Sequence, residues 1–269
     1  MYRGVMAKPR KPPKPSLSPT RIATYLECAM KYRYVYVDKI GRYYIRSQPD
    51  SSLGSTLHRV LRTFHEEGAL HTAEELVSRV GEKWVSAGFV TPEQEQDYRL
   101  AGEAMVQSYR EAHQERVSTQ TETILAEKQI KADMGTFRLA GRIDRVDRYP
   151  DGSLEVIDYK SGRWEATSDE VATDLAMNIY QLILRRNHPG ARVFATIYCL
   201  RSGIQASAEM AEEEAECFAV DIQVIGEEII SRDFENVEPL RIEACERCEF
   251  VSRCERFWRR QEQWESIRD

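Results

Sequence analysis

The sequence predicts an α/β fold with a mixed central β-sheet. Two apolar-rich runs, 141–147 and 154–162, flank a Tyr-Pro-Asp-Gly-Ser turn and predict a β-hairpin. Apolar residues at helical spacing precede and follow this hairpin, over 53–116 and 168–187. A chain of 269 residues is long enough to bury a full core. We therefore expect a single domain over residues 20–269.

Residues 1–19 contain five prolines and five basic residues without an acid, which is typical of a disordered tail. Such a tail is either a flexible arm for phosphate backbones or an idle remnant. The whole chain has a net charge of −6, which argues against a broadly basic surface for nucleic acids. We find neither an apolar run of about 18 residues nor the apolar core of a secretory signal. These features predict a cytoplasmic protein without membrane contact.

The helices are predicted from capping residues and apolar periodicity. Ser18 is a predicted N-cap and Pro19 opens the first turn, so a helix begins there. Its core-facing positions are expected at Ile22, Tyr25, Leu26, Ala29 and Tyr32. The region 53–116 is mostly helical, with a long helix from Pro92 to about Glu115.

Three further strands are predicted around the hairpin. Residues 122–133 form the first, and 192–200 and 204–208 form two more, joined by an Arg-Ser-Gly turn. The segment 168–187 is predicted to be the helix that follows the hairpin. An acidic run starting at residue 209 leads into a helix that ends near residue 232 and has a solvated face.

The hairpin carries charged residues with a specific chemical use. Successive side chains of a strand alternate between faces, so Asp158 and Lys160 share a face, with Cα atoms about 6.6 Å apart. Asp144, on the neighbouring strand, can lie beside them. Two carboxylates of this kind hold a hard divalent cation that accepts a phosphate oxygen, and the lysine can orient water or stabilise charge. The alternative is a surface salt bridge without function.

Gly-Arg-Ile-Asp-Arg at 141–145, followed by Asp-Tyr-Lys-Ser-Gly at 158–162, resembles the active-site signature of the PD-(D/E)XK nuclease superfamily. More narrowly, it is similar to the RecB-like branch with an iron–sulfur cluster, which includes AddB nuclease domains and CRISPR-associated exonucleases. The resemblance implies a restriction-endonuclease-like catalytic core over 122–208 and a helical insertion over 53–116. It also implies phosphodiester hydrolysis of DNA with Mg²⁺ or Mn²⁺.

The resemblance also implies roles for individual residues. Gly54 to His58 matches a Gly-x-x-x-His motif whose histidine is a metal ligand, although a lone histidine is more often a packed or exposed one. Glu127 matches an acidic position on the first strand; its alternative is a solvent-facing side chain. The expected metal ligands are His58, Asp144, Asp158 and the backbone carbonyl of Tyr159. The expected catalytic residues are Glu127, Asp144, Asp158 and Lys160.

The family usually shows a Gln-x-x-x-Tyr motif on the helix after the catalytic strand. With Tyr180 as the tyrosine, the glutamine position holds Ala176; with Gln181 as the glutamine, the tyrosine position holds Arg185. One partner is missing in either register, which puts this helix's contact with DNA in doubt. The candidate DNA contacts are Tyr180, Gln181, Arg142 and Arg145.

Three of the six cysteines form a Cys-x2-Cys-x5-Cys pattern near the C-terminus. Iron–sulfur clusters and structural zinc both favour four thiolates, and Cys28 is the candidate for the fourth. The spacing is similar to the 4Fe–4S arrangement of the RecB-like branch, with zinc as the alternative. The region 240–262 is then expected to close onto Cys28. The predicted cluster ligands are Cys28, Cys245, Cys248 and Cys254.

The resemblance favours an exonuclease acting on single-stranded DNA ends, in repair, recombination or CRISPR adaptation. No Gly-x4-Gly-Lys-Ser/Thr motif is present, so the chain has no Walker-type ATPase. Action alone or with a helicase, recombinase or integrase partner is therefore expected. Two other classes stay open: a nuclease subunit gated by its partner, and a non-catalytic module that binds DNA ends.

Overall fold

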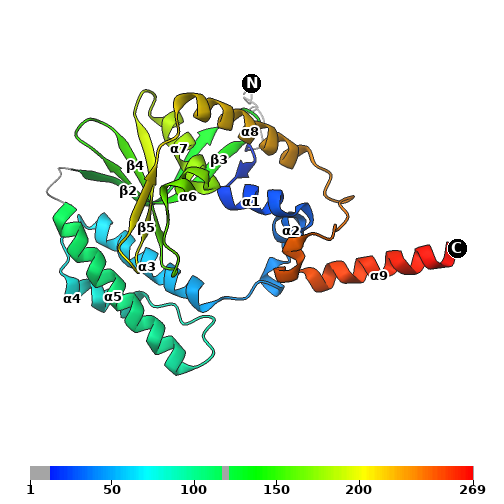
Figure 1. The fold of residues 1–269 in the computed structure, drawn as a ribbon, viewed down its shortest axis with the longest axis horizontal. Helices are drawn as coiled ribbons and strands as arrows, with labels where there is room; N and C mark the ends of the chain where they lie inside the picture. Colours follow the sequence, from blue (N-terminus) through cyan, green and yellow to red (C-terminus); the bar gives the residue numbers. More distant parts are fainter. Residues whose placement is uncertain (1–12, 117–120, 269) are drawn as a thin grey trace, which may run out of the picture.

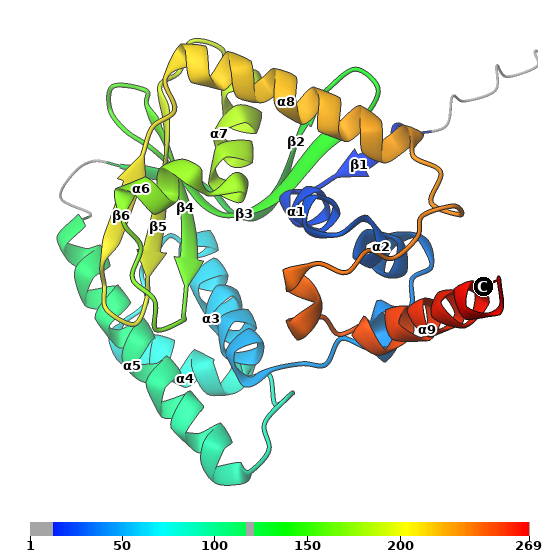
Figure 2. The same ribbon diagram turned by 45° about the vertical axis from the view of Figure 1, so that its right-hand side comes forward.

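The computed structural model describes residues 13–116 and 121–268, built around a six-stranded mixed sheet with helices on both faces (Figure 1). The prediction of an α/β fold with a mixed sheet is confirmed. Three helices lie along one face of the sheet: α3 (Pro49–Glu66), α4 (Ala73–Lys83) and α5 (Pro92–Arg116). The opposite face carries α1 (Pro19–Glu27), α7 (Leu175–Asn187) and α8 (Glu212–Ser231), as Figure 2 shows.

The strand order is β1-β3-β4-β5-β6, with β2 also paired to β3. Their bounds are Ser16–Leu17 for β1, Glu122–Asp133 for β2, Arg138–Arg148 for β3, Leu154–Lys160 for β4, Val193–Cys199 for β5 and Gln205–Ala208 for β6. The β4–β5 and β1–β3 pairs are parallel, and the β2–β3, β3–β4 and β5–β6 pairs are antiparallel. The parallel β4–β5 pair needs a crossover, which α6 (Ser168–Thr173) and α7 supply.

The β3–β4 hairpin turns at residues 149–153 as predicted. Gly152 adopts a φ of 83°, which glycine reaches without steric cost. The amide of Gly152 donates to the carbonyl of Tyr149, and Asp151 accepts from the amide of Ser153. These local bonds fix the register in which β3 meets β4.

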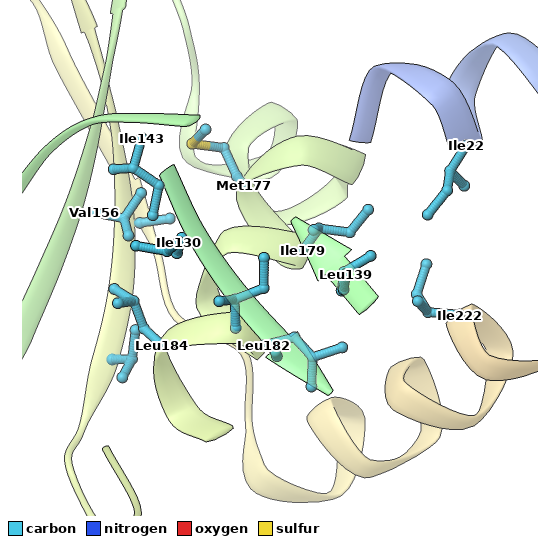
Figure 3. Packing of buried hydrophobic residues seen from close by; sticks show 14 of the residues in the cluster. Ile22, Ile130, Leu139, Ile143, Val156, Met177, Ile179, Leu182, Leu184 and Ile222 are labelled. Atoms are coloured by element: carbon cyan, nitrogen blue, oxygen red, sulfur yellow. The ribbon is translucent and has the colours of Figure 1, made fainter. Parts of the chain in front are cut away.

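Helix α7 packs its apolar side chains against the face of the sheet that also carries α1 and α8. Figure 3 shows four residues of this helix between the strands and the outer helices: Met177, Ile179, Leu182 and Leu184. Ile22 of α1 and Ile222 of α8 close the same cluster from outside (Figure 3). Burial of these side chains supplies about 1.5–3 kcal/mol each relative to exposure. This core holds the hairpin from one side.

The predicted helical insertion forms the second core, against the other face of β4 and β5. Leu57, Leu61 and Phe64 of α3 are fully buried there with Tyr159 of β4 and Tyr198 of β5. Ile157 and Tyr159 thus point to this face, as the strand alternation predicts. The helix α3 begins at Pro49, four residues before the expected start.

Two predicted helices are interrupted where a side chain caps a new helix. Cys28 is extended and separates α1 from α2 (Ala29–Tyr32), and its sulfur accepts from the amide of Lys31. Asp174 separates α6 from α7 and accepts from the amide of Met177. Leu26, which was expected in the core, is 54% exposed, while Ile22 and Tyr25 of the same helix are buried.

The predicted tail 1–19 ends earlier than expected. Residues 1–12 lie outside the described residues, but Ser16 and Leu17 form β1, parallel to the start of β3. Leu17 is buried, and Lys14 forms an ion pair with Asp133. The prediction of disorder is therefore wrong for residues 16–19. Leu17, an apolar residue in a polar segment, is buried where β1 pairs with the free edge of β3.

The remaining elements connect the sheet to the C-terminal end. A π-helical turn, Arg33–Val37, and a short 3₁₀ helix, Gly41–Tyr43, lead to α3. After α8, a second 3₁₀ helix, Glu243–Arg247, precedes α9 (Val251–Arg268), which extends from the rest of the chain (Figure 1). Among the described helices, none combines the length and the apolar character that crossing a membrane requires.

Candidate active site

Three elements bring their polar side chains to one point. His58 comes from α3, Glu127 from β2 and Asp144 from β3. The Nδ1 atom of His58 lies 2.8 Å from Oε1 of Glu127 and 3.0 Å from Oδ1 of Asp144. The ligand atoms of these three residues all lie within 4.8 Å of one another. They form one candidate metal-binding group.

Glu127 reaches this point through an unusual backbone conformation. Its φ is 46°, whereas Ala126 and Lys128 on either side pair regularly with β3. A residue other than glycine at positive φ is strained, and such strain gathers at functional sites. The side chain is buried, with Oε2 2.5 Å from Nε of Arg142.

Asp144 occupies the fork where β3 and β4 separate. The two strands pair from Arg148 and Leu154 to Arg145 and Ile157, and not beyond. At the next position, Oδ2 of Asp144 accepts from the backbone amide of Tyr159 at 2.8 Å. The carboxylate therefore replaces the strand carbonyl that would otherwise satisfy this amide. Its other oxygen stays directed at His58.

Asp158 and Lys160 share a face of β4 as the alternation predicts. Nζ of Lys160 lies 2.7 Å from Oδ2 of Asp158. Burial, followed by the negative charge of Asp144, raises the pKa of Asp158 to about 6. Burial lowers the pKa of Lys160, but the Asp158 carboxylate outweighs it, and the net pKa is raised. Lys160 is therefore an ammonium ion at neutral pH.

The site suits a divalent cation. Burial lowers the pKa of His58, yet hydrogen bonds with Asp144 and Glu127 outweigh it and raise the pKa to about 10. In the metal-free protein a proton on His58 thus offsets the charge of the two carboxylates. One imidazole and buried carboxylates are a ligand set that Mg²⁺ and Mn²⁺ accept. The donor chemistry fits the predicted metal.

Two of the four candidate DNA contacts lie at the site. Arg142 lies beside Glu127 with 62% of its side chain exposed. Tyr180 of α7 packs its ring against Gly141 so closely that a Cβ at Gly141 would lie 2.4 Å from a ring carbon. Burial and then the charges of Asp158 and Asp144 raise the pKa of the Tyr180 phenol far above its usual value. The glycine of the sequence motif therefore makes room for this tyrosine.

The other two candidates are corrected by the structure. Arg145 is 2% exposed and forms an ion pair with Asp147, while its guanidinium also donates to the hydroxyl of Tyr109. Gln181 is fully buried, and its side-chain oxygen accepts from the amide of Met210. Neither side chain is exposed at the surface of the described part of the chain. Both are instead internal hydrogen-bonding groups.

The sequence-family model of the PD-(D/E)XK nuclease superfamily matches residues 16–255, which include every residue of this site. The chain belongs to this superfamily.

Two individual proteins resemble this superfamily member. An ATP-dependent helicase/deoxyribonuclease subunit of Carboxydothermus hydrogenoformans is 25% identical over 210 residues, and the match covers 64% of this chain and 18% of that protein. The chain thus spans less than a fifth of that distant relative's length. A solved structure, described as the crystal structure of SSO0001, matches 84% of this chain and 94% of its own with 13% identity and a TM-score of 0.34.

The four cysteines expected to hold a cluster lie in one hydrophobic region, next to Phe250 and Trp258. Burial raises the pKa of the Cys254 thiol, and the sulfurs of the other three cysteines add to the rise. Within the described residues, no three of these sulfurs converge as ligands of one ion. Superfamily membership does not require such ligands, so the iron–sulfur cluster and the branch that carries it stay predictions. Of the other two cysteines, Cys199 is buried and Cys217 is exposed.

Polar residues of α3 were missed by the sequence reasoning. Ser51, Ser55 and Arg59 line the cavity that contains His58, Glu127 and Asp144. They follow one another at four-residue intervals, so a single helix face presents them. That spacing, taken together with His58, is the signal in the sequence that could have identified them.

Proposed function

We propose that this chain is a divalent-metal-dependent deoxyribonuclease that hydrolyses phosphodiester bonds. The observation that carries the proposal is the convergence of His58, Glu127 and Asp144 beside the Asp158–Lys160 pair. The name of the distant relative, a helicase/deoxyribonuclease subunit, supports DNA as the substrate. Superfamily membership supports hydrolysis.

Each of these residues would have a separate role in the reaction. His58, Asp144, Asp158 and the carbonyl of Tyr159 would hold Mg²⁺ or Mn²⁺, with Glu127 beside them. The cation supplies charge neutralisation and a more acidic water. Lys160, charged and 45% exposed, orients the attacking water and stabilises the negative charge that develops on the phosphate. The oxygen of that water becomes part of the phosphate as the bond to the leaving oxygen breaks.

We further propose exonucleolytic action on single-stranded ends and a helicase, recombinase or integrase partner. The resemblance of the active-site motifs to RecB-like exonucleases supports the first. The helicase in the relative's name supports the second. We also propose a 4Fe–4S cluster on Cys28, Cys245, Cys248 and Cys254, supported by the four-thiolate spacing and their shared hydrophobic region.

Cleavage of end-labelled DNA tests this function. The protein, purified without oxygen, is incubated with single- and double-stranded DNA and with Mg²⁺, Mn²⁺ or EDTA. We expect cation-dependent cleavage that Asp158→Asn abolishes and that Lys160→Ala slows by roughly 10²–10⁴-fold. Asp169→Asn, an exposed position on α6, is the matched control and should cleave normally.

Different outcomes separate the alternatives. Cleavage that persists in Asp158→Asn would contradict this active site. Absence of cleavage by a protein that binds Mn²⁺ and DNA ends would favour a partner-gated subunit or an end-binding module. The ladder of products from DNA labelled at either end shows the polarity of an exonuclease.

A further inference from the structure

The cavity beside the candidate metal ligands continues along α3. Its volume is about 420 Å³, and the α3 side of its wall is formed by Ser51, Ser55 and Arg59 together with His58. Helix α3 also approaches the segment that follows Lys160, because a Cβ on Gly54 would lie 3.4 Å from Oγ of Ser161. The cavity therefore lies against both the metal ligands and the end of the catalytic strand.

The α3 wall offers hydrogen-bond donors. Ser51, Ser55 and Arg59 are exposed, and none of the residues that line this cavity is Phe, Tyr or Trp. The imidazole of His58 also lines it, with Nδ1 directed at the carboxylates of Glu127 and Asp144. Within the described part of the chain, no carboxylate forms an ion pair with Arg59, whereas Arg62 on the same helix is paired with Glu66. Hydroxyl and guanidinium donors are the groups that contact phosphate oxygens, and base stacking requires aromatic rings.

Arg142 provides a second cation on the opposite wall. Its Nε atom lies 2.5 Å from Glu127, so the guanidinium is held next to the metal ligands while most of the side chain stays exposed. Arg59 follows His58 directly in α3. The two arginines therefore flank the candidate metal ligands from two different elements.

We propose that Arg59, with Ser55 and Ser51 behind it, binds the backbone phosphate that neighbours the phosphate to be cleaved. This inference rests on the proposed function and names how its substrate is held: through the phosphodiester backbone rather than through the bases. The subsite therefore accepts any sequence. It holds the strand in register with the metal ligands, because Arg59 and His58 are adjacent residues of one rigid helix.

The test compares Arg59→Ala with Arg62→Ala in the full chain. Binding of a fluorescent single-stranded oligonucleotide is measured by anisotropy in Mn²⁺ over a range of salt concentrations, and cleavage is measured on the same oligonucleotides. Arg59→Ala should raise Kd and KM about tenfold with kcat little changed. It should reduce the slope of log K against log salt by about 0.7, the value for one phosphate of a single strand.

Controls distinguish a phosphate contact from a structural role. Arg62→Ala removes a paired arginine one turn away and should change neither the slope nor KM. Arg59→Lys should restore most of the salt slope, because a lysine also neutralises a phosphate. Oligonucleotides of different sequence should lose the same factor, and Mn²⁺ affinity should stay unchanged in every variant.

The inference and the proposed function fail in different ways. An unchanged salt slope and Kd in Arg59→Ala overturn the phosphate subsite, whether or not the protein cleaves. A wild-type protein that does not bind the oligonucleotide overturns it as well. A protein that binds DNA with the expected Arg59 dependence but does not cleave supports the subsite and contradicts nuclease activity of this chain on its own.

Discussion

At Glu127 the backbone lies in the left-handed region, at a φ of 46°. The neighbouring residues keep their pairing with β3, so the strain is confined to the residue whose carboxylate faces His58 and Arg142. Strain of this kind persists where the surrounding structure imposes it. We infer that the strained backbone of Glu127 lowers the stability of the fold and directs the carboxylate toward His58 and Arg142.

A pair of substitutions separates the strain from the carboxylate. Glu127→Gly and Glu127→Ala both remove the side chain, but glycine adopts positive φ without steric cost. In EDTA, Glu127→Gly should have a free energy of unfolding about 1 kcal/mol above that of Glu127→Ala. Both should bind Mn²⁺ more weakly than the wild type. Urea unfolding and calorimetry check these outcomes, and equal stability of the two variants would show that the position is not strained.

Metal binding should be linked to the proton on His58. A histidine ligand must be neutral, whereas the carboxylates raise the pKa of His58 to about 10 in the metal-free protein. Mn²⁺ affinity should therefore rise with pH from neutrality to about 10, and close to one proton should be released per metal bound at pH 7. Calorimetry in buffers of different ionisation enthalpy measures this number. His58→Asn should release none, and a wild type that releases none would exclude His58 as a ligand.

The sequence predicted which side chains of one strand share a face. It did not predict which side chains pair with each other in the core. The shared face of Asp158 and Lys160 follows from the geometry of any strand. Arg145 was a candidate DNA contact, yet Asp147, two residues on, pairs with it in the core. The Arg145 guanidinium also donates to the hydroxyl of Tyr109 of α5, which no local pattern connects to β3.

At the scale of elements, a buried polar network joins the helices α3 and α5 to the strands β3 and β4. Arg145 of β3 contacts Asp147 and the hydroxyl of Tyr109, which lies 2.7 Å from that of Tyr159 and 2.6 Å from Nε2 of His65. His65 follows His58 by two turns of α3. The helix α3 is thus fixed to the sheet at two points, through His65 in the network and through His58 at the candidate metal-binding group.

Breaking this network should destabilise the protein strongly. Arg145→Met leaves Asp147 buried without its partner, which costs about 3–5 kcal/mol. Arg145→Met combined with Asp147→Leu should recover part of that loss, although the hydroxyls of Tyr109 and Thr123 then lose hydrogen-bond partners. Unfolding in urea checks both variants. A loss below about 1 kcal/mol in Arg145→Met would show that the pair contributes little.

The boundaries of elements were predicted unevenly. The strand 122–133 was predicted with its observed bounds. The breaks at Cys28 and Asp174 were missed, because each depends on one side chain accepting from an amide three residues on. Aspartate is a common N-cap residue, so the sequence contained a signal for the break at Asp174. The cysteine is an unusual cap.

For the whole molecule, two separate cores hold the sheet, and a third hydrophobic region joins residues near both ends of the described chain. Met30 and Tyr34 pack there with Phe250 and Trp258, and Lys31 pairs with Glu249 at 3.5 Å. The resemblance of the cysteine pattern implied that region 240–262 closes onto Cys28, but it did not specify these apolar contacts. The identity of a bound metal could not be obtained from that spacing.

Loss of a cysteine should reveal whether a cluster joins these segments. If the proposed cluster is present, Cys28→Ala should lose iron and inorganic sulfide and unfold at a lower temperature, because cluster binding contributes to folding. Cys217→Ala, at an exposed position of α8, is the matched control and should keep both. Metal analysis and visible absorbance of protein purified without oxygen provide the measurement. Zinc in place of iron, or full iron content in Cys28→Ala, would contradict the cluster.

Where β3 and β4 separate, one backbone amide is sensitive to the charge of the Asp144 carboxylate. The amide of Tyr159 donates to Oδ2 of Asp144 rather than to a strand carbonyl. Any event that draws charge from that carboxylate, such as a cation or a proton, weakens the acceptor of this one hydrogen bond. The chemical shift and the solvent-exchange rate of a single backbone proton should therefore follow the state of the Asp144 carboxylate, without a label placed in the site.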